Sequence, residues 1–218
     1  WHLVGKPAAL YVDLGHVYGS QEEHVVSELY RVEEDDGGWT RRCDITRCGR
    51  VGKWEQEDGY IPARNGLLSL LASYEGDEIF LALQKGELEL YDRSSKFCCE
   101  ASGFLTNLHG RKKVVDSHVW EMTKAQMVSW YLGKRFPLEK LLLTWSCYKN
   151  VERHCASCPA CFRRWIAFSY NGIAEEWYEK MSRWEGVKEY IKRMEAGLYD
   201  QQRTEETMTV LRAYGVVK

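Results

Sequence analysis

The sequence predicts an α/β fold in which helices flank a parallel sheet. Apolar runs lie at residues 8–12, 78–83 and 114–115, and segments of helical periodicity separate them. A weaker strand is expected at residues 42–45. Each of the first three segments is dominated by a continuous apolar run rather than by alternation with polar residues, as in strands that helices cover on both faces. A cysteine-rich segment and a charged C-terminal segment follow this core.

The composition excludes several classes of protein. The chain has 30 Lys and Arg against 32 Asp and Glu, a net charge of −2, which is too balanced for a general nucleic-acid or membrane-surface binder. Because 44% of the 218 residues are hydrophobic, the chain can bury a sizeable core. No apolar run approaches the roughly 18 residues that a membrane span needs. We therefore expect a cytoplasmic protein with no membrane segment and no direct nucleic-acid partner.

Local signals place helices between the apolar runs. Ser20, followed three residues later by a glutamate, has the spacing of a capping box and predicts a helix over residues 20–31. Leucines at helical spacing predict another over residues 67–74. Thr123 is expected to cap a third helix that ends near residue 132.

Three segments are expected: an α/β core over residues 1–140, a metal-binding segment over 141–172 and a helical extension over 173–218. In the last of these, Trp, Met and Tyr recur at roughly helical spacing among many charged residues, which predicts one or two amphipathic helices. Their apolar stripe either docks on the core or forms an interface with a partner, since Trp and Tyr are favoured there. A homodimer is left open.

Four of the eight cysteines crowd into fifteen positions, as Cys147, Cys155, Cys158 and Cys161. Two-residue gaps let one turn present several sulfurs to a metal, and we expect Cys147 to reach in from the end of a preceding strand over residues 141–145. Four thiolates leave a tetrahedral Zn²⁺ no open position, so the zinc would be structural. An iron–sulfur cluster is the competing interpretation, and His154 is an alternative ligand.

Five segments in order resemble the QueC family of 7-cyano-7-deazaguanine synthases. The cysteine segment begins within Thr-Trp-Ser-Cys-Tyr and is followed by Ala-Phe, and Tyr-Ile-Pro-Ala-Arg-Asn resembles the "VPARN" or "VPGRN" segment of that family. Thr-Lys-Ala resembles its "TKAEI" helix start. Two looser counterparts are Tyr-Asp-Arg-Ser-Ser-Lys-Phe and Asp-Leu-Gly-His. The residues concerned are 144–168, 60–65, 123–125, 91–97 and 13–16.

Two departures from the family pattern matter. The family belongs to the PP-loop ATP pyrophosphatases, whose SGGxDS signature follows the first strand, and that signature is absent from this sequence. Either the chain as given lacks the first strand and loop, which we expect, or the protein has lost its pyrophosphate-binding loop. Residues 84–87 also differ from the usual apolar-Asn-Ala-Val-Asp run, so the substrate-side loop is altered.

The resemblance implies an ATP-dependent C–N ligase. Members of the family convert 7-carboxy-7-deazaguanine and ammonia into 7-cyano-7-deazaguanine (preQ0) through adenylated intermediates, and the ATP is bound with Mg²⁺. Two alternatives remain. The enzyme could stop at the amide or pass the activated deazaguanine to another acceptor such as a protein amine. Otherwise, the chain is a non-catalytic, zinc-stabilised binding module.

The resembling motifs and side-chain chemistry suggest roles for particular residues. Arg64 offers a rigid fork for a carboxylate or phosphate, although it could instead form a salt bridge that caps the following helix. Lys124 lies in a first helical turn, where a cation is unfavourable without an anionic partner. We expect both to be catalytic.

Other residues are expected to bind the substrate and ATP. Asp92 could read the guanine-like edge while Tyr91 or Phe97 stacks on the ring. Asn65 supplies a donor and an acceptor. Asp13 and Gly15 are expected near the ATP, although local N–H groups could equally satisfy a loop carboxylate at position 13.

Overall fold

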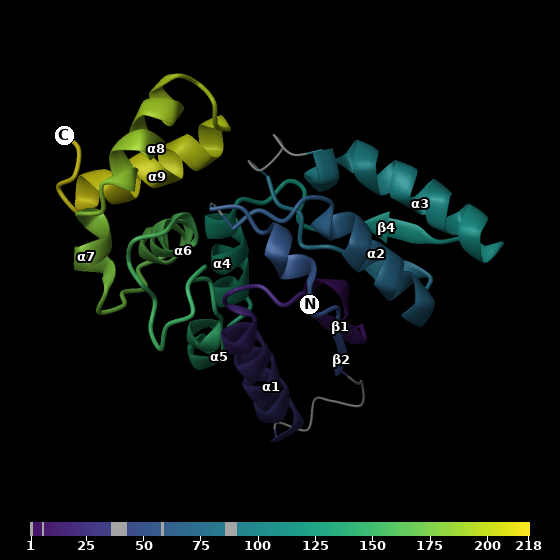
Figure 1. The fold of residues 1–218 in the computed structure, drawn as a ribbon. Coiled ribbons are helices and arrows are strands. Elements are labelled where there is room, and N and C mark those ends of the chain that lie inside the picture. The colour runs from purple at the N-terminus through teal and green to yellow at the C-terminus, as the bar shows by residue number, and fades with distance from the viewer. Residues whose placement is uncertain (1, 6, 36–42, 58, 86–90) are drawn as a thin grey trace. The chain divides into compact units, whose positions relative to one another are not determined.

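A computed structural model of the chain describes residues 2–5, 7–35, 43–57, 59–85 and 91–218. The chain divides into two compact units (Figure 1). The N-terminal unit comprises residues 1–16 and 30–121, and the C-terminal unit comprises residues 17–29 and 122–218. Helix α1 (Gly19–Asp35) connects the first two strands.

The N-terminal unit contains two pairs of parallel strands. Strand β1 (Ala9–Asp13) pairs with β2 (Cys43–Arg47), and β3 (Glu78–Phe80) pairs with β4 (Val114–Asp116). In register, Ala9 lies opposite Cys43 and Glu78 lies opposite Val114. The unit also has helices α2 (Arg64–Glu75) and α3 (Ser95–His109) and the short 3-10 helices η1 (His2–Val4), η2 (Val51–Trp54) and η3 (Tyr91–Arg93).

Parallel strands at the predicted positions confirm the α/β class, but among the described residues they form two pairs rather than one sheet. Helix α2 packs against both: Leu67 and Leu71 contact the apolar cluster that contains Val12, and Leu70 contacts the cluster around Ile79. Strand β3 ends at Phe80, earlier than predicted. Beyond its end, the Leu81 N–H still donates to the Asp116 carbonyl (2.9 Å), and the Leu83 carbonyl accepts a hydrogen bond from the Ser117 hydroxyl (2.8 Å).

Of the two predicted helix caps, one is confirmed and one is wrong. Thr123 caps helix α4 (Lys124–Gly133) with a complete capping box, in which its side chain and that of Gln126 each bind the other's backbone N–H. Helix α1 begins at Gly19, so Ser20 lies inside the first turn, and its hydroxyl hydrogen-bonds the Gln21 side chain (2.7 Å). The predicted Ser20 capping box is therefore wrong.

Helix α6 (Pro159–Tyr170) lies at the centre of the C-terminal unit. Its apolar side chains, including Phe162, Trp165 and Phe168, are buried, and α4, α7 (Tyr178–Ser182) and α9 (Gln201–Ala213) pack against it. The remaining helices are α5 (Leu138–Leu143) and α8 (Gly186–Glu195). Among the residues that the structure describes, no helix combines the length and apolar character needed to cross a bilayer.

Two predictions about the C-terminal unit need correction. Residues 138–143 form a helix, where we predicted a strand leading into the cysteines, because leucine, lysine and glutamate favour helix and no β-branched residue opposes them. Three helices rather than one or two follow residue 173. Their apolar side chains, among them Met181, Val187 and Leu211, are buried in the core cluster. The prediction that the apolar stripe of these helices packs on the protein core is thus confirmed.

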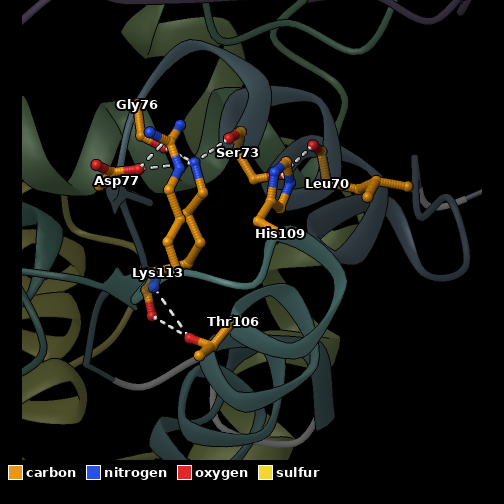
Figure 2. Close-up of polar contacts among 8 residues, drawn as sticks. Leu70, Ser73, Gly76, Asp77, Thr106, His109 and Lys113 are labelled. Carbon is orange, nitrogen blue, oxygen red and sulfur yellow. Dashed lines mark hydrogen bonds and ion pairs between the residues drawn. The ribbon is translucent and has the colours of Figure 1, made fainter.

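Lys113 closes the C-terminus of α2 (Figure 2). Its side chain is fully buried, and its Nζ donates to the carbonyls of Ser73 and Gly76 (2.8 Å to the latter) and pairs with the Asp77 carboxylate (2.8 Å). The last carbonyls of a helix lack intrahelical partners and favour a cation. The hydrogen bond from Lys113 lowers the pKa of Asp77, so Asp77 stays ionised and paired to a lower pH than an ordinary aspartate would.

A serine and a histidine also meet in this cluster without forming a nucleophile and its base. The Ser73 hydroxyl lies 2.9 Å from Nε2 of His109 and donates to the Leu70 carbonyl (2.6 Å). Since its proton is used by that carbonyl, the hydroxyl accepts from the imidazole, whereas a nucleophile would donate to it. Ser73 is also fully buried. The cluster is therefore structural.

Replacing Lys113 by methionine is expected to destabilise the fold by roughly 2–4 kcal/mol, because it leaves buried carbonyls without a donor. Urea unfolding measures the change. The matched control is Lys112→Met at the exposed neighbouring position, for which we expect less than about 0.5 kcal/mol. Equal stability of the two variants would show that Lys113 does not stabilise the end of α2.

Candidate functional site

The structure brings the four predicted cysteines together in the C-terminal unit. The Sγ atoms of Cys147, Cys155, Cys158 and Cys161 all lie within 4.8 Å of one another, and the Cys155 and Cys161 sulfurs are 3.9 Å apart. Cys147 and Cys161 are fully buried. The cluster therefore lies in the core of the unit.

A tight turn and a helix start create this geometry. Ala156 adopts a left-handed backbone conformation with φ 52° between the second and third cysteines. Cys158 then caps α6, with Pro159 at the first helical position, so that Cys161 falls in the first turn. The Cys158 sulfur accepts the Cys161 backbone N–H at 3.4 Å. Backbone donors of this kind favour a thiolate.

The four sulfurs fit a single tetrahedral metal ion. Zn–S bonds of about 2.3 Å place the sulfurs of a tetrahedron about 3.8 Å apart, close to the 3.9 Å between Cys155 and Cys161. A four-iron cluster would bind each sulfur to a different iron and hold the sulfurs farther apart. With thiols alone, hydrogen bonding to Cys158 raises the pKa of Cys147 to about 11. Binding of a cation would displace such protons.

His154 is not part of the cluster, although it was an alternative ligand. Its ring lies between those of Trp145 and Trp177, with centroid distances of 4.8 and 5.1 Å. Burial, followed by the positive charge of Arg164, lowers the pKa of His154 to about 4. His154 is therefore a neutral packing residue near the turn that carries Cys155.

Arg164 is a buried clamp that we did not predict. It is 1% exposed, and its guanidinium donates to Glu175 (2.8 and 3.1 Å), to the carbonyl and hydroxyl of Thr144 (2.8 and 2.7 Å) and to the Leu142 carbonyl (3.1 Å). It thereby joins the chain before the cysteines to the chain after α6. Its position three residues after Cys161, on the buried face of the same helix, was the available signal.

Glu175 stays ionised opposite this clamp. Burial alone would raise the pKa of Glu175, but the Arg164 hydrogen bonds and charge, together with a hydrogen bond from Tyr178, lower it overall. The Tyr178 hydroxyl donates to the same carboxylate at 2.8 Å. The pair is therefore a hydrogen-bonded salt bridge in the interior of the unit.

In the N-terminal unit, two predicted substrate residues are in direct contact. The Asn65 backbone N–H lies 3.4 Å from Oδ2 of Asp92, and its side-chain Nδ2 donates to the Asp92 carbonyl at 2.9 Å. Asp92 is 8% exposed, and among the described residues its Oδ1 is buried without a hydrogen-bond partner. An unpaired buried carboxylate oxygen is costly, and such groups concentrate where a ligand binds.

The other two predicted substrate residues lie beside this pair. Tyr91 precedes Asp92 in η3, and its ring meets that of Phe97 edge to face at 6.1 Å. Ser94 caps α3, and its hydroxyl accepts the Phe97 backbone N–H at 3.1 Å. Asn65, Tyr91, Asp92 and Phe97 therefore gather where α2, η3 and α3 begin.

Arg64 and Lys124 each begin a helix. Arg64 is the half-buried first residue of α2, after Ala63, whose φ of 57° is a conformation that glycine adopts at lower cost. Lys124 is the first residue of α4, in the C-terminal unit. Their catalytic roles stay predictions.

Asp13 and Gly15 form a closed turn at the end of β1. The Gly15 N–H donates to Oδ1 of Asp13 at 2.8 Å. Gly15 has φ 71°, and a Cβ there would lie 2.7 Å from the Gly49 carbonyl oxygen, so only glycine fits. A local N–H thus satisfies the Asp13 carboxylate, as expected if Asp13 only stabilises the loop. Their role in ATP binding stays a prediction.

Comparisons with known proteins agree with these features. A family model described as "Queuosine biosynthesis protein QueC" matches residues 40–172. That range includes the four cysteines, the Asn65–Asp92 site and the start of α4, and it ends before α7.

Curated relatives are named 7-cyano-7-deazaguanine synthase. The protein of Archaeoglobus fulgidus is 33% identical over 141 residues, which cover 56% of this chain and 57% of the relative. That of Brucella canis is 31% identical over 122 residues, covering 52% and 51%. That of Sulfolobus acidocaldarius is 29% identical over 124 residues, covering 53% and 26%. The chain thus spans about half the length of the first and second of these relatives and about a quarter of the third.

Proposed function

This chain belongs to the QueC family, and on that premise we propose that it converts 7-carboxy-7-deazaguanine and ammonia into 7-cyano-7-deazaguanine at the expense of ATP. Relatives named for this product support the proposal. The observation that carries it is the gathering of Asn65, Tyr91, Asp92 and Phe97 around an unpaired buried carboxylate oxygen.

The chemistry of a deazaguanine suits this site. Its pyrimidine edge presents an N1–H and an exocyclic amine, two adjacent donors that a carboxylate accepts together. Asp92 is the residue proposed to accept them. Asn65 holds the Asp92 backbone through the 2.9 Å hydrogen bond to its carbonyl, and the Asn65 backbone N–H faces Oδ2 of Asp92 at 3.4 Å. The exposed Tyr91 ring and the half-buried Phe97 ring would pack on the flat heterocycle.

The proposed reaction needs activation of a poor electrophile. A carboxylate would have to expel oxide, so transfer of AMP onto it, with release of pyrophosphate, first creates a leaving group. Ammonia then displaces AMP to give the amide, and a second adenylation on the amide oxygen allows loss of AMP and a proton to leave the nitrile. Arg64 and Lys124 are proposed to stabilise the negative charge that develops on the phosphate and carboxylate oxygens, and Mg²⁺ to accompany the ATP.

Zinc is the ion proposed for the four cysteines, since their spacing fits tetrahedral thiolate ligation. With no open coordination position, the zinc would stabilise the fold and take no part in catalysis. It would hold the loop around Cys155 and the N-terminus of α6 to the segment that carries Cys147. A reducing compartment, such as the cytoplasm, keeps these thiols available.

Incubation of the full-length protein with 7-carboxy-7-deazaguanine, ammonium and Mg-ATP tests the function. We expect AMP, pyrophosphate and the nitrile, identified by liquid chromatography and mass spectrometry, and no nitrile without ammonium. An amide as the final product would support the alternative in which the enzyme stops after the first adenylation. No AMP under any condition would contradict the proposal and favour a binding module.

Asp92→Asn is expected to weaken binding of 7-carboxy-7-deazaguanine by about 10- to 100-fold, because an amide N–H₂ would face donors of the ligand. The melting temperature is expected to stay the same or rise, since the variant removes an unpaired buried charge. Calorimetric titration and thermal unfolding measure the two effects. Glu78→Gln, at an exposed position of the same unit, is the control. Loss of stability with unchanged binding would show that Asp92 is structural.

A further inference from the structure

A buried glutamate from the last helix meets the start of α4. Glu206 of α9 is 2% exposed, and its Oε1 accepts a hydrogen bond from the Thr123 hydroxyl at 2.8 Å. The Gln202 side chain, one turn earlier on α9, donates to the same oxygen at 3.1 Å. Thr123 is also buried and is the N-cap of α4. Eighty-three positions separate the two partners in the sequence.

The direction of the hydrogen bonds links the carboxylate to the helix end. The Gln126 backbone N–H donates to Oγ1 of Thr123 at 3.1 Å, which leaves the single hydroxyl proton of Thr123 for Glu206. The three groups thus form a chain from a first-turn N–H of α4 to a carboxylate. A negative charge at a helix N-terminus is favourable, and such a chain strengthens each of its bonds.

This arrangement bears on Lys124, the residue that follows Thr123. A lysine in the first turn of a helix opposes the helix dipole, and the protein itself supplies a carboxylate one hydrogen bond from the N-cap. The hydrogen bond also fixes the rotamer of Thr123, and the complete capping box fixes the first turn. The position of Lys124 therefore depends on α9 through Thr123.

We propose that Glu206 is a positioning residue that holds Thr123, and with it Lys124, at the start of α4. For the role of Lys124 in the reaction, the inference rests on the proposed function. Helix α9 lies outside residues 40–172, which the family model matches, so this support comes from the C-terminal extension.

Four variants of the full chain test the inference. Glu206→Leu removes the acceptor and its charge, and Thr123→Val removes the hydroxyl at nearly constant volume. Thr123→Ser keeps the hydroxyl and is the conservative rescue. Glu205→Gln is the matched control, because Glu205 is an exposed neighbour on α9 that hydrogen-bonds Gln201. Should Glu206→Leu fail to fold, Thr123→Val probes the same bond.

The first readout is the acylation rate of Lys124 by an amine-reactive ester, followed by mass spectrometry. Loss of the bond between Glu206 and the N-cap loosens the first turn of α4, so that the Lys124 side chain is exposed to the reagent more often. We expect Glu206→Leu to react at least about threefold faster than the wild type. Thr123→Val should react faster as well, while Thr123→Ser and Glu205→Gln stay unchanged. An unchanged rate in both Glu206→Leu and Thr123→Val would overturn the inference.

The second readout is the split between kcat and KM for AMP formation. Misplacing Lys124 is expected to lower kcat about tenfold, the effect of about one charged hydrogen bond, with an unchanged KM for the deazaguanine acid. The double variant Glu206→Leu/Thr123→Val should lose no more of its kcat than either single variant, because both changes remove the same bond. If Glu206→Leu lowers the melting temperature but leaves kcat unchanged, Glu206 stabilises the fold without positioning Lys124. If the wild type forms no AMP, the proposed function fails, and Lys124 acylation alone decides the inference.

Discussion

Cys161→Ser is expected to abolish metal binding and to unfold the C-terminal unit. Cys161 is fully buried in the first turn of α6, around which α4, α7 and α9 pack. Structural zinc contributes about 10–16 kcal/mol to small zinc-finger domains, and a buried serine would leave three crowded thiols and an unsatisfied hydroxyl. We expect loss of near-ultraviolet circular dichroism and of the cooperative thermal transition, because four of the unit's tryptophans belong to this core cluster.

Two comparisons make that result specific to the metal site. Cys99→Ser, at an exposed position of α3, should leave the zinc content and the thermal transition unchanged. A strong chelator should bring the wild type close to Cys161→Ser and should have little further effect on the variant. A Cys161→Ser protein that folds as stably as Cys99→Ser would show that the four sulfurs do not support the fold through a metal.

Arg164→Met is expected to cost about 3–5 kcal/mol of unfolding free energy, the second-largest effect we predict. The variant keeps much of the side-chain volume but leaves the ionised Glu175 buried without its partner, and it removes the donors to Thr144 and Leu142. Denaturant unfolding measures the loss. Arg183→Met removes an exposed ion pair to Glu179 and should cost less than about 1 kcal/mol.

A double variant separates the charge from the packing. Adding Glu175→Gln to Arg164→Met removes the unpaired buried charge, so the double variant should be more stable than Arg164→Met alone. If the two single losses add instead, the side chains act independently and the clamp between the flanks of the cysteine segment is disproved.

Much of the fold was accessible from the sequence wherever a local signal was unambiguous. The run at residues 8–12 lacks polar interruptions and became β1, and Thr123 has both the N-cap chemistry and the partner at the third position that α4 needed. The leucine-rich run at 141–145 was misjudged because a short apolar segment suits a buried strand or a helix equally well. Its flanking Leu-Glu-Lys was the better signal.

The metal centre could be predicted because its ligands are close in sequence. Two-residue spacings largely determine where Cys155, Cys158 and Cys161 point once a turn and a helix start are in place. The buried contacts that support the C-terminal unit could not be predicted, because Arg164 meets Glu175 and Glu206 meets Thr123 only after the helices have packed. Periodicity alone indicates that Arg164 lies on a buried face, but it does not identify the partner.

The metal content of the purified wild-type chain tests the central claim, that four thiolates hold one structural ion in the core of the C-terminal unit. We predict one zinc per chain by elemental analysis and an X-ray absorption spectrum with four sulfur neighbours at about 2.3 Å. A chain without metal, one with iron in place of zinc, or a zinc shell containing nitrogen or oxygen would contradict the account.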